Sequence, residues 1–177
     1  MNKKQSLLLL TAAAAGSVIY NIWKPVKSKL PVVTDLILSK YLGDWYEIAR
    51  LDFYWEKNLK NVSASYSLKK DGNIKVVNQG QHIHSGKIKT SIGKAKPVGE
   101  PTKGALKVSF FGPFYSGYNI MHIDENYQYA LIFGDSLDYI WILSRTTTIP
   151  EAIKAKYLAY AQSAGYSINN LIWTKHD

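Results

Sequence analysis

The stretch Gly43-Asp44-Trp45-Tyr46-Glu47-Ile48-Ala49-Arg50 begins the first of eight short runs that are rich in β-branched and aromatic residues. The later runs follow at intervals of roughly 8 to 15 residues, with turn-forming residues such as Lys70-Asp71-Gly72-Asn73 between them. This spacing is typical of an all-β sandwich or barrel. We predict strands at residues 45–51, 62–68, 74–79, 88–95, 106–111, 115–123, 127–134 and 137–144.

After the last run the hydrophobic period changes to that of a helix. Ile153, Tyr157, Tyr160 and Ala164 fall at helical spacing, and Gly165 is suited to end the helix. Residues 148–151, Thr-Ile-Pro-Glu, have the pattern of a capping box. We therefore predict one C-terminal helix that packs against the strands, followed by a short strand or tail at residues 171–173.

The N-terminus differs in composition from the rest of the chain. Residues 1–23 begin with two lysines and continue as an apolar run, which predicts either a signal anchor that forms a hydrophobic helix or a cleavable signal peptide. Residues 24–34 contain three lysines and two prolines and read as a linker. We predict a single folded domain from 35 to 177.

Composition excludes several classes of function. The chain of 177 residues has no cysteine, which rules out disulfides, thiolate metal sites, a cysteine nucleophile and thioether lipidation. The net charge of +9 comes from scattered lysines without an arginine-rich run. It therefore indicates a solvated basic surface rather than a nucleic-acid-binding protein, and attraction to an anionic membrane surface is the other alternative.

Three segments resemble the lipocalin signatures in their family order. Residues 43–50 resemble the first signature, 124–130 the second and 141–146 the third. Residues 46–52, 105–115 and 138–146 are similar to the branch of the family that contains the bacterial lipocalin Blc and apolipoprotein D. The resemblance covers roughly residues 40 to 175.

The resemblance implies an eight-stranded antiparallel up-and-down barrel with one flanking helix. It also implies a fatty acid or lysophospholipid as ligand, with no catalysis and no cofactor. In the family pattern the last-strand arginine covers the first-strand tryptophan and closes one barrel end. The residues that would carry this structural signature are Gly43, Trp45, Asp124, Tyr127 and Arg145.

The absence of cysteine departs from the branch, whose bacterial members commonly carry a lipidated cysteine. A retained N-terminal segment would then attach the barrel to the membrane, in the cell envelope and facing the periplasm. The sequence leaves open whether two barrels pair as a homodimer.

Strand alternation predicts which side chains line the interior. Side chains alternate between the two faces of a strand, so if Arg145 points inward, Leu143 points inward too. The same alternation gives one set of inward-facing side chains on each of the other strands. The predicted pocket-lining residues are Ala64, Tyr66, Leu68, Leu106, Val108, Phe110, Tyr118, Ile120, Tyr129, Leu131, Phe133, Tyr139, Trp141 and Leu143. Because buried hydroxyl and indole groups need partners, the surplus of Tyr and Trp favours a hollow interior over a filled core.

Other functions are not favoured by the sequence. His82 and His84 would share a strand face, but two ligands do not make a metal site. The chain has no nucleophile elbow, and lipocalin isomerases depend on a cavity cysteine, so we expect no enzyme activity. A structural or interaction module with a filled barrel, and a carrier of another small hydrophobic ligand such as a tetrapyrrole, remain the alternatives.

Overall fold

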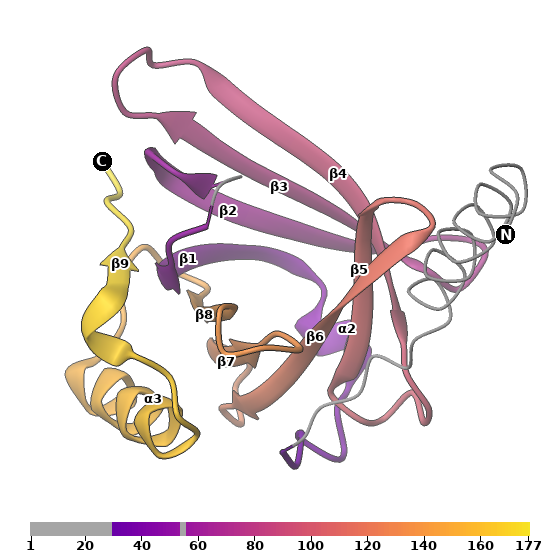
Figure 1. The fold of residues 1–177 in the computed structure, drawn as a ribbon. Helices are drawn as coiled ribbons and strands as arrows, with labels where there is room; N and C mark the ends of the chain where they lie inside the picture. The colour runs from indigo at the N-terminus through magenta and orange to yellow at the C-terminus, as the bar shows by residue number, and fades with distance from the viewer. Residues whose placement is uncertain (1–29, 54–55) are drawn as a thin grey trace, which may run out of the picture.

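A computed structural model describes residues 30–53 and 56–177, which form a closed antiparallel barrel with a helix on its flank (Figure 1). Each strand from β1 to β8 pairs with the next, and β1 also pairs with β8, which closes the sheet. The predicted up-and-down barrel is therefore confirmed. The barrel strands are β1 (Gly43–Leu51), β2 (Leu59–Leu68), β3 (Ile74–His82), β4 (Ile88–Pro97), β5 (Ala105–Phe111), β6 (Phe114–Ile123), β7 (Tyr129–Phe133) and β8 (Ile140–Ser144).

Strand β1 carries the bulge that decides which of its side chains face inward. It pairs with β2 through Trp45 and Ala64, and with β8 through Arg50 and Trp141, with a register shift between residues 47 and 49. A bulge inserts one extra residue and resets the alternation of the strand. As a result Glu47 lies on the inner face together with Arg50, although they are three residues apart.

Two hydrophobic clusters stabilise the fold, one inside the barrel and one outside it. The inner cluster includes Trp45, Tyr66 and Ile120. The outer cluster lies between the barrel wall and helix α3 (Glu151–Ser163), where Tyr157 and Ala161 are buried. Figure 1 shows α3 beside β8 and β9, the short strand Leu171–Trp173 that pairs with β1.

The C-terminal helix has the predicted apolar face but not the predicted cap. Ile153, Tyr157, Tyr160 and Ala164 all belong to the outer cluster. Pro150 occupies the N-cap position in an extended conformation, and no side chain caps the helix. The predicted capping box is therefore wrong, because a proline N-cap side chain has no hydrogen-bonding group.

The segment that precedes β1 is hydrogen-bonded to the barrel through Val33. Val33 donates its N–H to the Ile120 carbonyl and accepts from the Gly104 N–H at 2.8 Å. A Cβ at Gly104 would lie 2.6 Å from the Val33 side chain, so this close approach requires glycine. The short helix α2 (Leu38–Tyr41) then leads into β1.

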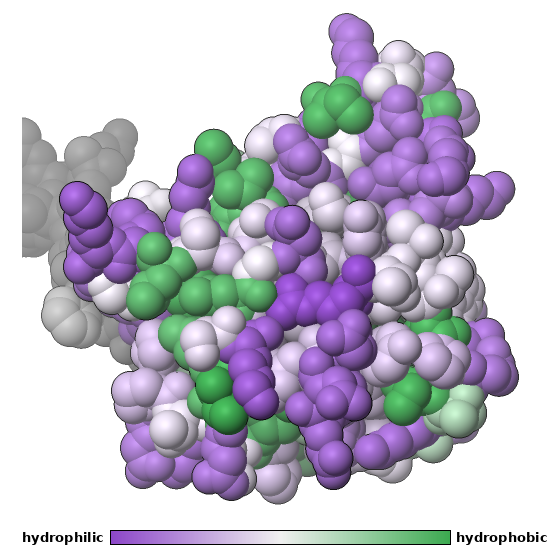
Figure 2. Space-filling model, turned by 180° about the vertical axis from the view of Figure 1, so that it is seen from behind, coloured by the Kyte–Doolittle hydropathy of each residue, from purple (hydrophilic) through white to green (hydrophobic). Residues whose placement is uncertain are grey.

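The predicted N-terminal segment, residues 1–23, and the linker up to residue 29 lie outside the described residues. Within the described part, no helix has the length and apolar character needed to cross a membrane. On the rear face of the molecule, hydrophilic residues are spread widely and separated by several apolar patches (Figure 2).

Candidate ligand-binding cavity

One end of the barrel is closed by Arg145 and Trp45. The Arg145 Cζ atom lies 3.9 Å from the centre of the Trp45 ring. The guanidinium also donates to the carbonyls of Asp44 at 2.6 Å, Lys40 at 2.8 Å and Leu42 at 2.9 Å. A planar guanidinium can stack on an aromatic ring while its edge donors form hydrogen bonds. This contact therefore ties the end of β8 to the segment that leads into β1.

The turn between β6 and β7 completes this closed end. The Asp124 carboxylate accepts backbone N–H groups from Gln128 and Tyr129, both at 2.6 Å. Tyr127 adopts a left-handed conformation with φ of 57°, and its carbonyl accepts from Arg145 Nε at 3.2 Å. Gly43 also has a left-handed φ, of 94°. The five predicted signature residues thus surround the closed end, and none of them lines the cavity.

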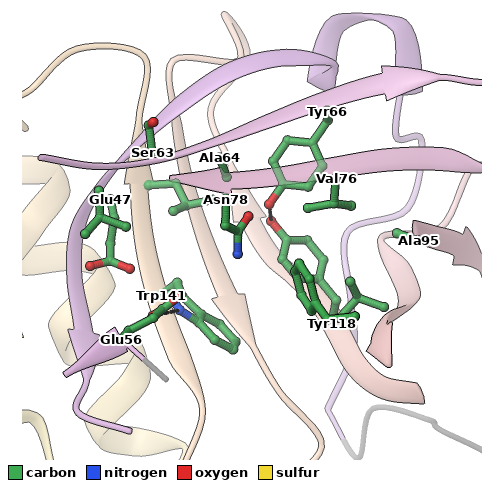
Figure 3. Close-up of a pocket in the computed structure, with 14 residues that line it drawn as sticks. Glu47, Glu56, Ser63, Ala64, Tyr66, Val76, Asn78, Ala95, Tyr118 and Trp141 are labelled. Atoms are coloured by element: carbon green, nitrogen blue, oxygen red, sulfur yellow. Dashed lines mark hydrogen bonds between the residues drawn. The ribbon is translucent and has the colours of Figure 1, made fainter. Parts of the chain in front are cut away.

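Above this seal the barrel contains a cavity (Figure 3). It encloses about 580 Å³ of space that no protein atom occupies, including its opening to solvent. It is lined by Glu47, Glu56, Val62, Ser63, Ala64, Tyr66, Val76, Asn78, Ala95, Val108, Phe110, Tyr118, Trp141 and Leu143.

Half of the predicted pocket residues line this cavity. They are Ala64, Tyr66, Val108, Phe110, Tyr118, Trp141 and Leu143. Leu106 and Ile120 belong to the inner cluster but are packed away from the cavity surface. Tyr139 is half-buried and stacks on Trp141, with ring centres 6.2 Å apart, without lining the cavity.

The parity predicted for β7 is wrong. Tyr129, Leu131 and Phe133 pack in the outer cluster beneath α3, whereas Ala130 and Ile132 belong to the inner cluster. Both faces of this strand are buried, one by the barrel interior and one by the helix. A strand buried on both faces has no polar alternation, so its sequence does not reveal which face is inward.

Leu68 is also outside the cavity, with 58% of its side chain exposed. The pairing of β1 with β2 ends at Gly43 and Tyr66. Leu68 therefore lies beyond the end of the neighbouring strand, next to the hairpin turn, and its side chain reaches solvent.

Three tyrosine hydroxyl groups form a buried chain beside the cavity. Tyr118 is hydrogen-bonded to Tyr41 at 2.6 Å and to Tyr66 at 2.8 Å. Burial raises the pKa of all three hydroxyl groups, which keeps them protonated at neutral pH. The three hydroxyl groups carry three hydrogens, and the two hydrogen bonds between them use only two. The third hydrogen can therefore be donated to another acceptor.

The opposite side of the cavity carries a charged cluster that the sequence did not predict. Arg50 is 1% exposed, and its Nη1 lies 2.5 Å from Glu47 Oε1. Its Nη2 donates to the Glu56 carbonyl at 2.6 Å, and its Nε lies 3.7 Å from Glu56 Oε2. Thr174, just after β9, donates to the same Glu47 oxygen at 2.5 Å.

Glu56 is the unusual member of this cluster. Its Oε2 accepts from Trp141 Nε1 at 3.4 Å. Burial, reinforced by the charge of Glu47, raises the pKa of Glu56 to about 8, although Arg50 opposes the shift. Glu56 therefore holds a proton at neutral pH.

The remaining polar lining residues also escaped the sequence prediction. Asn78 contributes an amide from β3, and its Oδ1 is buried without a hydrogen-bond partner. No group of three or more His, Cys, Asp or Glu side chains among the described residues could hold a metal ion. His82 and His84 lie at the end of β3 and beyond it, with ring centres 5.6 Å apart.

The family and its relatives are identified by comparison with known proteins. Residues 35–176 match the family model for the lipocalin-like domain. The chain is 44% identical over 170 residues to the outer membrane lipoprotein Blc of Escherichia coli strain K12, covering 96% of each chain. It is 35% identical over 129 residues to apolipoprotein D of Bos taurus, covering 68% of this chain and 66% of that protein.

Among solved structures, insecticyanin from the tobacco hornworm Manduca sexta is similar, with a TM-score of 0.68 at 19% identity. The match covers 86% of this chain and 88% of insecticyanin. At this level of identity the similarity supports the barrel fold alone.

Proposed function

This chain belongs to the lipocalin family, and on that premise we propose that it binds a single-chain lipid in the barrel cavity. The ligand is a fatty acid or lysophospholipid, which the protein stores or transports in the bacterial cell envelope for membrane maintenance. The protein acts as a binding protein and not as an enzyme.

The observation that carries this proposal is the apolar lining of a cavity that is closed at one end. Apart from Glu47, Glu56, Ser63 and Asn78, its lining residues are aliphatic or aromatic. Burying an acyl chain of about twelve methylenes at ~0.8 kcal/mol each contributes about 10 kcal/mol before ordering costs. Association and ordering costs reduce this gain, so the affinity depends on how far the cavity is already formed before the ligand enters.

The shape of the cavity favours this ligand over the alternatives. The barrel interior holds about 580 Å³ of space that no protein atom occupies, lined mainly by apolar side chains, which suits a linear acyl chain. A filled barrel would leave no such space, which argues against a purely structural module.

The proposed location in the cell envelope is supported by the names of the Blc relatives and by the apolar composition of the N-terminal segment. The Blc relatives are named outer membrane lipoproteins, but this chain contains no cysteine to carry a thioether-linked lipid. We propose that residues 1–23 attach the barrel to the membrane instead. Fractionation and intact mass of the native protein test this. Recovery of the mature protein in the soluble fraction, without these residues, would contradict the attachment.

The ligand proposal is tested by native mass spectrometry of the purified protein and by titration with a fluorescent fatty acid. Val108→Trp fills the cavity and is expected to weaken uptake at least tenfold. Lys107→Trp adds the same side chain to the neighbouring, outward-facing position of β5 and should leave uptake unchanged. Failure of the wild-type protein to take up any amphiphile would refute the proposal.

A further inference from the structure

We propose that the cavity selects amphiphiles whose polar end is an ammonium group, which pairs with the carboxyl group of Glu56. This inference rests on the proposed lipid-binding function and narrows its ligand. A fatty acid carries no ammonium, so the inference favours a lysophospholipid with an amine head group or a long-chain amine over a fatty acid. The acyl chain would lie along the apolar side of the same cavity.

The balance of charge at the cavity wall is the first argument. Glu47 and Glu56 contribute two carboxyl groups, and Arg50 contributes a single guanidinium that contacts both. Among the described residues, no second lysine or arginine forms an ion pair with either carboxyl group. With Glu56 protonated, Glu47 and Arg50 balance each other. Ionisation of Glu56 leaves the cluster short of one positive charge, which a bound ammonium would supply.

The hydrogen bonds show which carboxyl group is available. Glu47 is occupied, because it accepts from Arg50 and from Thr174 on the same oxygen. Among the described residues, the carboxyl group of Glu56 accepts a long hydrogen bond from Trp141 at 3.4 Å and shares a hydrogen bond with Glu47, so one of its oxygens is less fully occupied than the Glu47 oxygen. Its side chain is 12% exposed, whereas that of Glu47 is 4% exposed. Glu56 is therefore the carboxyl group that a ligand can reach.

Incomplete hydrogen bonding in the cluster is the second argument. Arg50 Nε is buried without an acceptor, and Asn78 Oδ1 is buried without a donor. Ionised Glu56, 3.7 Å from Arg50 Nε, is a better acceptor for that N–H than the protonated acid. An ammonium carries three N–H donors, and the cavity lining offers two acceptors for them, the Glu56 carboxylate and the unpartnered Asn78 amide oxygen.

The arrangement of the cavity fits a ligand whose head group lies beside Glu56 and whose acyl chain lies at the opposite side. Figure 3 shows Glu47 and Glu56 on one side, Tyr118 and Ala95 on the other, and Trp141 in between. The indole of Trp141 can attract a cation through its ring face. The apolar residues Val76, Ala95, Val108 and Phe110 remain for the acyl chain.

The charged and titratable groups around Glu56 determine the pH dependence. Glu47, Arg50 and Asp52 contribute from β1 and its end, Tyr66 from β2, and His176 contacts the Glu47 carbonyl from the C-terminal tail. Because the pKa of Glu56 is raised to about 8, an ammonium must displace its proton below that pH. Ammonium binding therefore strengthens as the pH rises toward 8 and releases a proton below it.

Competition against a fluorescent fatty acid, with the full chain, tests the proposal. The competitors are dodecylamine, dodecanoate and dodecanol, which differ only in the head group. At pH 8 we expect dodecylamine to bind at least tenfold more tightly than dodecanoate. Equal affinities of these two ligands would overturn the inference while leaving the proposed function intact, whereas no binding of any of the three would overturn both.

Two variants test whether Glu56 is the group that causes the preference for the amine. Glu56→Gln should reduce dodecylamine affinity at least tenfold and leave dodecanol affinity unchanged, which also reports that the variant is folded. Glu125→Gln, in the exposed β6–β7 turn, is the matched control and should change neither affinity. An unchanged preference for the amine in Glu56→Gln would overturn the assignment to Glu56.

Calorimetry of the wild-type protein tests the same point without a mutation. Dodecylamine binding at pH 7, measured in two buffers with different ionisation enthalpies, should show release of about one proton, as expected when the raised pKa of Glu56 returns toward its usual range. No proton release would contradict the proposal.

Lysophospholipids of equal chain length identify the source of the ammonium. Tighter binding of the ethanolamine than of the glycerol head group would support an ammonium from a membrane lipid. Discrimination limited to the free amines would support a long-chain amine as the ligand.

Discussion

The guanidinium of Arg145 lies over the indole of Trp45, with Cζ 3.9 Å from the ring centre, and this contact joins the last barrel strand to the first. Trp45 Nε1 donates to the Tyr41 carbonyl, and Arg145 Nη2 donates to the same carbonyl at 3.1 Å. The two side chains thus share an acceptor in α2, which holds this helix across the closed end of the barrel.

Replacement of Arg145 should destabilise the barrel without removing the cavity. Arg145→Ala loses the stacking and several charge-assisted hydrogen bonds, and we expect the free energy of unfolding to fall by about 3 kcal/mol. Arg145→Lys keeps the charge but not the planar fork of donors, so a loss of about 1–2 kcal/mol is expected. Urea denaturation measures both. The exposed control Lys156→Ala should change stability by less than ~0.5 kcal/mol.

The tyrosine chain predicts unequal effects of two similar substitutions. Tyr118→Phe removes the central hydroxyl group and leaves two buried hydroxyl groups without their partner, at a cost of about 2–3 kcal/mol. Tyr66→Phe removes an end of the chain and should cost about 1 kcal/mol. Thermal or urea unfolding compares the two. Equal losses would show that the chain does not act as a connected network.

The outer face of β7 should affect stability and not ligand binding. Leu131 is fully buried in the outer cluster beneath α3, so Leu131→Ala should lower the free energy of unfolding by about 2–5 kcal/mol. Affinity for a fluorescent fatty acid should stay within about twofold of wild type, because Leu131 lies outside the cavity lining. A large loss of affinity in a folded variant would place Leu131 on the wrong face.

The raised pKa of Glu56 predicts that stability falls as the pH rises. The folded protein retains the Glu56 proton up to a pKa of about 8, whereas the unfolded chain loses it near the ordinary glutamate pKa of 4.5. Stability from this group is therefore fully present below about pH 4.5 and is lost as the pH rises through 8.

Glu56→Gln should remove that part of the pH dependence, so the two proteins are compared by urea denaturation from pH 5 to pH 9. The wild type should lose of the order of 3 kcal/mol more than the variant over this range. Parallel curves for the two proteins would contradict the raised pKa.

Much of the architecture could be predicted from local patterns. Eight runs of strand-forming residues and turns such as 70–73 gave the number and order of the strands, with boundaries within a few residues. The helical stripe of Ile153 and Tyr157 correctly predicted packing of α3 outside the barrel. These features depend on neighbouring residues, which is why they are visible in the sequence.

The cavity was only partly predictable, because its composition depends on strand irregularities. Parity gave Trp141 and Leu143 correctly on β8, where one face meets the cavity and the other meets the helix. It failed on β7, where both faces are apolar, and it did not place Glu47 beside Arg50, because the bulge in β1 shifts the alternation.

The sequence by itself determined the strand runs and the location of the helix, since periodicity and local turn chemistry specify these elements, while the closed barrel and its closing signature were implied by the resemblance to lipocalins. Only the tertiary structure decided that Glu47, Arg50 and Glu56 meet at one side of the cavity. Their contact depends on a bulge, on the path of the β1–β2 loop and on the C-terminal tail, and each of these is set by residues that are distant in the chain.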